Sequence, residues 1–378
     1  MNAPVYLDYN ATAKIRPEAL AAIQAALEIG ANPSSTHAAG RQARALIERA
    51  RAEIAALVGA EAGWLTFVSG GVEANALAIE SALAAGCGRA IIGATEHDAV
   101  LATAQAVFPN VEIWPVDAEG VADLDWLVDA LAREGRPLVC LMAANNETGV
   151  IQPIEAVSAL VRQAGGWLHV DAVQAAGKLT LDCAALGADT LALSAHKLGG
   201  PQGVGALVTR PDVAITRQLH GGGQERGRRA GTENLSGIAG FGAAAAAAQR
   251  DLAPGHALAQ GEWRDALADR LIAVGAEVLG AGAPRLPQTL CIATPGFSSE
   301  VQVMALDLAG VMVSAGAACS SGKVKASRVV ETMGRPDLAS ASIRVSGGWA
   351  STAADWRRCG DAWLEAHARR MARNREYA

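Results

Sequence analysis

The sequence predicts an α/β fold in which helices cover both faces of a mainly parallel sheet. Between residues 17 and 193, segments with helical spacing of apolar residues alternate with short apolar runs bounded by turns. Strands that alternate with helices form parallel sheets, because each helix returns the chain to the edge where the next strand begins. The chain of 378 residues is 51% hydrophobic and 19% charged, so it can bury a sizeable core.

The expected elements follow one another in order. Apolar residues at three- and four-residue spacing predict helices over 17–30, 41–58, 73–85, 99–107 and 124–132. Short apolar runs predict strands over 64–68, 90–92, 111–115, 138–143, 166–170 and 190–193. An alanine-rich helix includes 243–248, and Pro254-Gly255 then interrupts the chain. A helix over 263–274, short strands and a closing helix over 353–370 follow, so we place a domain boundary near residue 255.

Composition and charge exclude several classes of protein. The net charge of −6 provides no basic field for nucleic acid. The longest apolar run, 237–248, is short and rich in Ala and Gly, so no membrane span is expected. The N-terminus has no basic region typical of a secretory signal. The six cysteines show no metal-binding spacing, which favours a reduced cytoplasmic protein without a metal site.

A glycine-rich turn over 69–73 joins an expected strand to an expected helix. Backbone N–H groups at Gly71 and Val72 would face an anion at the start of that helix, where the helix dipole favours negative charge. The turn lacks the lysine of a Walker loop, and an ordinary strand–helix turn is the alternative interpretation.

Two charged residues follow neighbouring strands. Asp171 comes just after the strand expected over 166–170, and ligands of α/β sheets bind at the carboxyl ends of strands. The alternative is that Asp171 caps the following helix. Lys197 follows the next strand, where a desolvated amine can form a Schiff base; a solvated loop lysine is the alternative. The remaining lysines indicate no such role: Lys14, Lys178, Lys323 and Lys325.

A phosphate cup, an acid for a ring nitrogen and a reactive lysine are together the components of a pyridoxal phosphate site. Cys319 is surrounded by small residues and lies near lysines that favour the thiolate, so it is a candidate nucleophile. Cys140 and Cys291 lie in apolar runs and are expected to be buried and inert. Arg344 is a candidate for carboxylate binding, with a surface ion pair as the alternative.

The chain resembles the cysteine desulfurases of the class V aminotransferase family, in their NifS/IscS-like group. The resemblance implies the pyridoxal-phosphate-dependent transferase fold type I, with a large domain over 15–255 built on a mainly parallel seven-stranded sheet. It also implies a smaller α+β domain made from 1–14 and 256–378. The matching stretches run nearly end to end: 6–12 YLDYNAT, 32–37 NPSSTH, 95–97 TEH, 145–149 NNETG, 170–174 VDAVQ, 194–197 SAHK, 229–232 RAGT, 314–321 SAGAACSS and 342–344 SIR.

The resemblance implies roles around the ring of pyridoxal 5'-phosphate. Lys197 is expected to hold the cofactor covalently, Asp171 to pair with its pyridine nitrogen, and His97 to stack on the ring and assist proton transfer. Gln174 and Asn146 are expected to approach the ring hydroxyl, and Asn146 also the substrate.

The same resemblance implies the residues that hold the cofactor's phosphate. Backbone groups of Gly71 and Val72, together with Ser194 and His196, are expected to bind it. Thr232 is expected to reach the phosphate of a neighbouring subunit, so the implied active unit is a homodimer.

The implied reaction begins with L-cysteine, whose carboxylate Arg344 would grip. Cys319 would then attack the substrate sulfur, leaving alanine and a persulfide for a sulfur acceptor. The acceptor is expected to be an iron–sulfur scaffold or a sulfur-carrier protein, with no nucleic acid or membrane partner.

Three departures from the family pattern bear on cofactor affinity and on the Cys319 segment. Val72 stands where the family usually carries a hydroxyl, Ser346 is followed by Gly347 and Gly348, and 323–326 lacks the common proline. Competing functions are a selenocysteine lyase or an aminotransferase of the same fold, and a non-catalytic scaffold that binds partners. Cys319 argues against transamination, and intact Lys197 and Asp171 argue against a scaffold.

Overall fold

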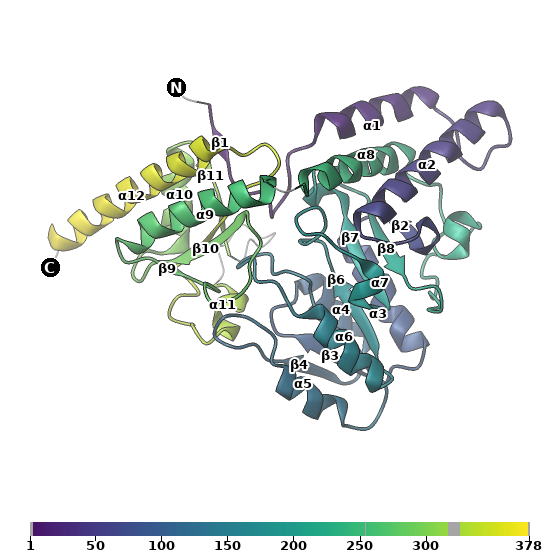
Figure 1. Ribbon diagram of the computed structural model, residues 1–378, viewed down its shortest axis with the longest axis horizontal. Helices are drawn as coiled ribbons and strands as arrows, with labels where there is room; N and C mark the ends of the chain where they lie inside the picture. The colour runs from purple at the N-terminus through teal and green to yellow at the C-terminus, as the bar shows by residue number, and fades with distance from the viewer. Residues whose placement is uncertain (1–2, 254, 317–325, 377–378) are drawn as a thin grey trace.

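The computed structural model describes residues 3–253, 255–316 and 326–376, and Figure 1 shows a large sheet beside a smaller second layer. The large sheet has seven strands in the order β2-β8-β7-β6-β5-β3-β4. All neighbours are parallel except β8, which runs antiparallel to both β2 and β7. The predicted mainly parallel seven-stranded sheet is therefore confirmed. Its strands are β2 (Leu65–Val68), β3 (Arg89–Gly93), β4 (Val111–Trp114), β5 (Pro137–Cys140), β6 (Trp167–Asp171), β7 (Thr190–Ser194) and β8 (Gly205–Thr209).

Helices cover both faces of this sheet because its strands are apolar on both sides. Ile91 of β3 packs into one core cluster, whereas Ala90 and Ile92 pack into another on the opposite face, as the two-residue period of a strand requires. The helices are α1 (Pro17–Ile29), α2 (Ala38–Leu57), α3 (Gly71–Ala84), α4 (Asp98–Val107), α5 (Leu124–Leu131), α6 (Ile154–Gln163), α7 (Cys183–Leu186) and α8 (Leu235–Asp251). Short 3₁₀ turns are η1 (Ala62–Trp64), η2 (Ala195–Lys197) and η3 (Gln224–Gly227).

The second layer is built around a four-stranded sheet in the order β12-β13-β10-β9, packed against α9, α10 and α12. A separate parallel pair joins β1 (Val5–Tyr6), near the N-terminus, to β11 (Val311–Met312). The remaining elements are α9 (His256–Ile272), β9 (Glu277–Val278), β10 (Thr289–Ala293), α10 (Ser299–Leu308), β12 (Ser314–Ala315), α11 (Arg328–Thr332), β13 (Ser342–Ser346) and α12 (Ala353–Glu376).

Several sequence expectations differ from the structure: β8 and α6 are not among the expected elements, and other elements begin or end at different residues. The helix expected over 263–274 begins earlier, at His256, directly after the break at Gly255. The strand expected over 138–143 ends at Cys140, and the rest of that apolar run continues as a loop. Among the described helices, none combines the length and apolarity needed to cross a membrane.

Candidate active site

A cavity of about 470 Å³ lies where the parallel strands β5, β6 and β7 end. Parallel strands present their carboxyl ends at one edge of a sheet, and the residues after them therefore meet there. The cavity is lined by nearly all of the predicted site residues: Gly71, Val72, His97, Asn146, Asp171, Gln174, Ser194, His196, Lys197 and Arg344. Thr232 is not among its lining residues, and Cys319 lies outside the described residues.

Lys197 ends the 3₁₀ turn that follows β7. Its Nζ donates to the backbone oxygens of Asn10 and Ala11, at 2.7 and 2.8 Å. Burial, assisted by the positive charge of Arg344, lowers the pKa of Lys197 to about 8. An amine with so low a pKa is partly unprotonated near neutral pH, and the unprotonated amine is the form that attacks a carbonyl.

Asp171 is the last residue of β6 and is buried at the base of the cavity. Its Oδ1 accepts the backbone N–H of Val173 at 2.9 Å, and its Oδ2 accepts Nδ2 of Asn75 at 2.8 Å. Each carboxylate oxygen has further lone-pair capacity, so the group can also hold a ring N–H.

The glycine-rich turn forms the N-terminus of α3, as the sequence predicts. Gly70 is the N-cap and provides no side-chain capping bond, so the first backbone N–H groups of this 14-residue helix are available to an anion. A Cβ at Gly71 would lie 3.1 Å from Cγ2 of Val173, which leaves little room for a larger residue. Val72 is 63% exposed beside the cavity.

His196 and His97 have ring nitrogens held by the protein. Nδ1 of His196 lies 2.7 Å from Oγ1 of Thr12, and burial together with Lys197 lowers the His196 pKa to about 4. Nδ1 of His97, the N-cap of α4, accepts the backbone N–H of Ala99 at 3.0 Å. In the neutral ring of His97 the proton is therefore on Nε2, where it can be donated to a ligand.

Arg344 reaches the cavity from β13, so it connects the two sheets. Its Nη2 donates to Oδ1 of Asp8 at 2.8 Å, and its Nη1 donates to the backbone oxygen of Asn146 at 3.2 Å. Arg344 is only 4% exposed, and its Nε has no partner among the described residues. A buried guanidinium with a free N–H fits a carboxylate ligand.

Two residues that the sequence did not single out join the predicted ones. Asn10 accepts Lys197 on its backbone oxygen, and the same oxygen accepts Nε2 of Gln174 at 2.9 Å. Lys178, for which no Schiff-base role is expected, contacts two residues of the cavity wall. Its Nζ donates to Oε1 of Gln174 at 2.6 Å and to Oδ1 of Asn10 at 3.1 Å. Gln174 and Lys178 are four residues apart, but no local pattern in the sequence connects either of them to Asn10.

Two buried carboxyl groups also line the cavity. Burial, together with the charge of Asp171, raises the pKa of Glu96 well above its usual value. Burial likewise raises the pKa of Glu147, whose Oε2 accepts the hydroxyl of Ser327 at 2.6 Å. Both shifts favour the neutral form of the carboxyl group, because burial penalises its charged form. Three or more metal-binding side chains do not gather anywhere in the part of the chain that the structure describes.

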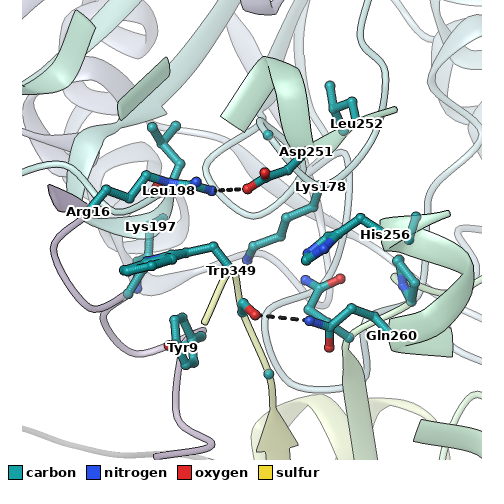
Figure 2. Close-up of a pocket in the computed structure, with 17 residues that line it drawn as sticks. Tyr9, Arg16, Lys178, Lys197, Leu198, Asp251, Leu252, His256, Gln260 and Trp349 are labelled. Atoms are coloured by element: carbon teal, nitrogen blue, oxygen red, sulfur yellow. Dashed lines mark hydrogen bonds and ion pairs between the residues drawn. The ribbon is translucent and has the colours of Figure 1, made fainter. Parts of the chain in front are cut away.

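A second cavity, of about 60 Å³, lies on the other side of Lys197 (Figure 2). In this view Lys178 extends between His256 and Trp349 toward the centre of the cavity. An ion pair between Arg16 and Asp251, with a 2.6 Å N–O distance, lies at its edge. Lys197 contributes to the lining of both cavities, so its side chain separates them.

Comparisons with known proteins agree with this geometry. The family model described as Aminotransferase class-V matches residues 5–358. A cysteine desulfurase of Cereibacter sphaeroides is 43% identical over 93% of this chain and 92% of its own length. The cysteine desulfurase IscS of Dictyoglomus turgidum is 38% identical over 94% of this chain and 92% of its own length. A NifS-like protein structure from Rickettsia africae superposes with a TM-score of 0.89 at 32% identity, covering 97% of this chain and 99% of that one.

Proposed function

Because this chain belongs to the cysteine desulfurases of the class V aminotransferase family, we propose that it removes sulfur from L-cysteine with pyridoxal 5'-phosphate as cofactor. The observation that carries this proposal is the convergence of Lys197, Asp171 and Arg344 on one cavity at the strand ends. A solved structure titled "SspA in complex with cysteine", 27% identical with a TM-score of 0.79, supports the choice of substrate.

The residues of the cavity suit the parts of this cofactor. When bound, pyridoxal phosphate supplies an electron sink that weakens the bonds of the attached amino acid. Lys197 would hold it covalently, and Asp171 would accept the N–H of its pyridine ring. Gln174 and Asn146 would contact the ring hydroxyl, and His97 would lie against the ring.

The phosphate of the cofactor would lie at the N-terminus of α3. The backbone N–H groups of Gly71 and Val72, in the first turn of α3, would donate to it, and Ser194 and His196 also line the cavity. Thr232 would contribute from the second subunit of a homodimer, because it does not line the cavity of its own chain.

Substrate and sulfur transfer involve other residues. The unpartnered Nε of Arg344 would bind the substrate carboxylate, and Asn146 would contact the substrate. Cys319 would then attack the substrate sulfur. The substrate's Cβ–S bond breaks and an S–S bond forms, so that L-cysteine and the thiol give L-alanine and a Cys319 persulfide. The cysteine sulfur is oxidised to the sulfane level while Cβ gains a hydrogen and is reduced.

The persulfide would pass its sulfur to an acceptor protein, an iron–sulfur scaffold or a sulfur carrier, in a reducing compartment. The five cysteines among the described residues are free and buried, which supports the cytoplasm as that compartment. Burial raises the pKa of Cys359 to about 12, and it raises the pKa of Cys140 well above its usual value. Thiols that ionise so poorly make weak nucleophiles, which leaves Cys319 as the candidate.

The test is the release of alanine and sulfide from L-cysteine by the holoenzyme in the presence of a reductant. We expect wild type to release the two products in equal amounts. Cys319→Ala should keep the cofactor absorbance and lose sulfide release by several orders of magnitude, because the nucleophile is missing. The matched control is Ser320→Ala, the next residue in sequence, which should behave like wild type. Sulfide release by Cys319→Ala within threefold of wild type would refute the persulfide step.

A further inference from the structure

A chain of hydrogen bonds runs from the interior of the large sheet to Asp171. Oγ1 of Thr190 on β7 lies 2.9 Å from Nδ1 of His169 on β6. Nε2 of His169 lies 2.8 Å from Oδ1 of Asn75 on α3. Nδ2 of Asn75 then donates to Oδ2 of Asp171 at 2.8 Å. We call Thr190, His169 and Asn75 the Asp171 relay.

The direction of every proton in the relay follows from its last member. An ionised carboxylate only accepts hydrogen bonds, so the amide nitrogen of Asn75 must face Asp171 and its oxygen must face His169. Nε2 of His169 must therefore carry the proton, which leaves Nδ1 to accept the hydroxyl proton of Thr190. Oγ1 of Thr190 can in turn accept Nε1–H of Trp167, which lies 3.3 Å away.

The members of the relay are buried and uncharged. His169, Asn75 and Thr190 are each at most 1% exposed. Burial lowers the pKa of His169 to about 3, so the imidazole stays neutral at physiological pH. All donors in the relay point the same way, toward the carboxylate, and hydrogen-bonded groups in such a row polarise one another.

The relay supports Asp171 with neutral donors, as the hydroxyl of Ser327 supports Glu147 on the cavity wall, whereas two carboxylates outside the cavity lining are ion-paired. Asp8 is paired with Arg344, and Glu73 with Arg229, at 2.8 and 3.0 Å. Within the described ranges Asp171 forms no ion pair, and its two oxygens are held by neutral donors instead. A cationic partner would offset the negative charge of Asp171, and that charge is what stabilises a protonated ring nitrogen. Neutral donors instead fix the orientation of the carboxylate and leave its charge unchanged.

We propose that Asn75 and His169 are positioning residues, which orient Asp171 so that its carboxylate holds the ring nitrogen of the cofactor in the protonated state. This inference rests on the proposed use of pyridoxal phosphate. Asn75 lies on the wall of the cavity, and its amide fixes one oxygen of Asp171 from the helix side. His169, from within the sheet, fixes Asn75 in turn.

The first test measures the ring nitrogen itself. Apoprotein is loaded with pyridoxal phosphate labelled with ¹⁵N in the ring, and the ¹⁵N chemical shift and the cofactor dissociation constant are recorded. In Asn75→Ala and His169→Phe we expect the shift to move toward that of an unprotonated pyridine, and affinity to fall about tenfold or more. His169→Gln, whose amide N–H can take the place of Nε2–H, should restore both values to within threefold of wild type.

A matched control separates positioning from general destabilisation. Ser81→Ala removes a buried hydroxyl from the same helix, where it donates to the backbone oxygen of Leu77 at 2.6 Å. Any loss of stability in this variant should leave the ring-nitrogen shift unchanged. If Asn75→Ala and His169→Phe also keep the wild-type shift and affinity, the inference is wrong.

The second test uses apoprotein labelled with ¹⁵N in its histidines and does not depend on the cofactor. His169 should appear as the neutral Nε2–H form throughout pH 5 to 9. A titrating His169, or one protonated on Nδ1, would overturn the relay whatever the cofactor result. Failure of wild type to bind pyridoxal phosphate would instead count against the proposed function. The tautomer of His169 in the apoprotein would still show whether the relay exists.

Discussion

Lys197 is the residue whose environment most directly controls its chemistry. Burial and Arg344 lower its pKa to about 8, and only the unprotonated amine reacts with an aldehyde. We therefore expect capture of pyridoxal phosphate by the apoprotein to become faster as pH rises toward 8 and to level off above it. Stopped-flow absorbance would measure the rates.

Borohydride reduction and peptide mapping then identify the lysine that was modified. The label should lie on Lys197, because Lys197 lines the large cavity together with Asp171, whereas Lys178 does not line it. Lys197→Ala should abolish the label, and Lys178→Met should keep it on Lys197. A label found on Lys178 in wild type would show that the assignment is wrong.

Val72 is expected to weaken the binding of the cofactor's phosphate. Its side chain offers the phosphate no hydroxyl, although its backbone N–H lies in the first turn of α3. Val72→Thr is nearly isosteric and adds one hydrogen bond to a charged group, worth about 1.5–3 kcal/mol, or roughly 10- to 150-fold in affinity. We expect the variant to release cofactor more slowly than wild type when an aldehyde scavenger is present.

The control for this change is Val72→Ala, which alters the side chain without adding a hydroxyl and should not slow release. Val72 is 63% exposed, so neither substitution should disturb the core. If the Thr variant releases cofactor as fast as wild type, the side chain points away from the phosphate.

At the scale of elements, one buried ion pair fixes the 3₁₀ turn η3 against the sheet. Glu225 accepts Nη1 and Nη2 of Arg51 on α2, each at 2.8 Å, and also the backbone N–H of Phe67 on β2 at 2.8 Å. Glu225 and Arg226 adopt left-handed backbone angles, with φ of 47° and 59°, which cost free energy outside glycine. The bonds of Glu225 offset that cost.

Glu225→Gln should therefore lower the free energy of unfolding by about 3–5 kcal/mol, because it removes the buried counter-charge of Arg51 and leaves only the exposed Glu48, 3.3 Å from its Nε. Urea unfolding monitored by tryptophan fluorescence measures the change. The control is Glu18→Gln, which removes an exposed pair with Arg250 at 2.9 Å and should cost less than about 1 kcal/mol. Equal losses in the two variants would contradict this account of η3.

At the scale of the whole molecule, Thr232 is expected to contribute to the active site of a second subunit. It is exposed and lines a separate groove with Ser69 and Gly203, outside the large cavity. We expect a homodimer by light scattering, and Thr232→Val should retain less cofactor. Each mixed dimer of one Thr232→Val chain and one Lys197→Ala chain should contain one intact site. That site has Lys197 from the Thr232→Val chain and Thr232 from the Lys197→Ala chain. Absence of any recovery would show that Thr232 does not act across subunits.

The two sheets meet at residues far apart in the sequence. Asn10 donates to the backbone oxygen of Asn146 and to Oγ1 of Thr289, at 3.1 and 3.0 Å, so it joins the large sheet to the smaller one. The assignment of 1–14 and 256–378 to one small domain stays a prediction. Limited proteolysis between 253 and 255 followed by fragment analysis would test that boundary.

The sequence predicted many of the elements and the edge of the sheet where the site lies, because both depend on local patterns, but it did not mark β8 or α6. Alternating helix and strand periods specify a parallel sheet, and a parallel sheet brings the residues after its strands to one edge. Asp171, Lys197 and the turn at Gly71 could therefore be found without a structure. Helix starts were harder, as α9 shows: it begins at His256 after a glycine N-cap without a side-chain bond, so no capping signal marked it.

The contacts around those residues were decided by tertiary structure alone. Asn75 meets Asp171 across 96 residues of sequence, and Lys178 meets Asn10 across 168. No short-range pattern encodes such pairs, since they depend on which helix packs against which strand. Burial is likewise a property of the packed molecule, and burial makes His169 neutral and lowers the pKa of Lys197. The sequence thus determined which residues reach the site, and packing determined their charge and orientation there.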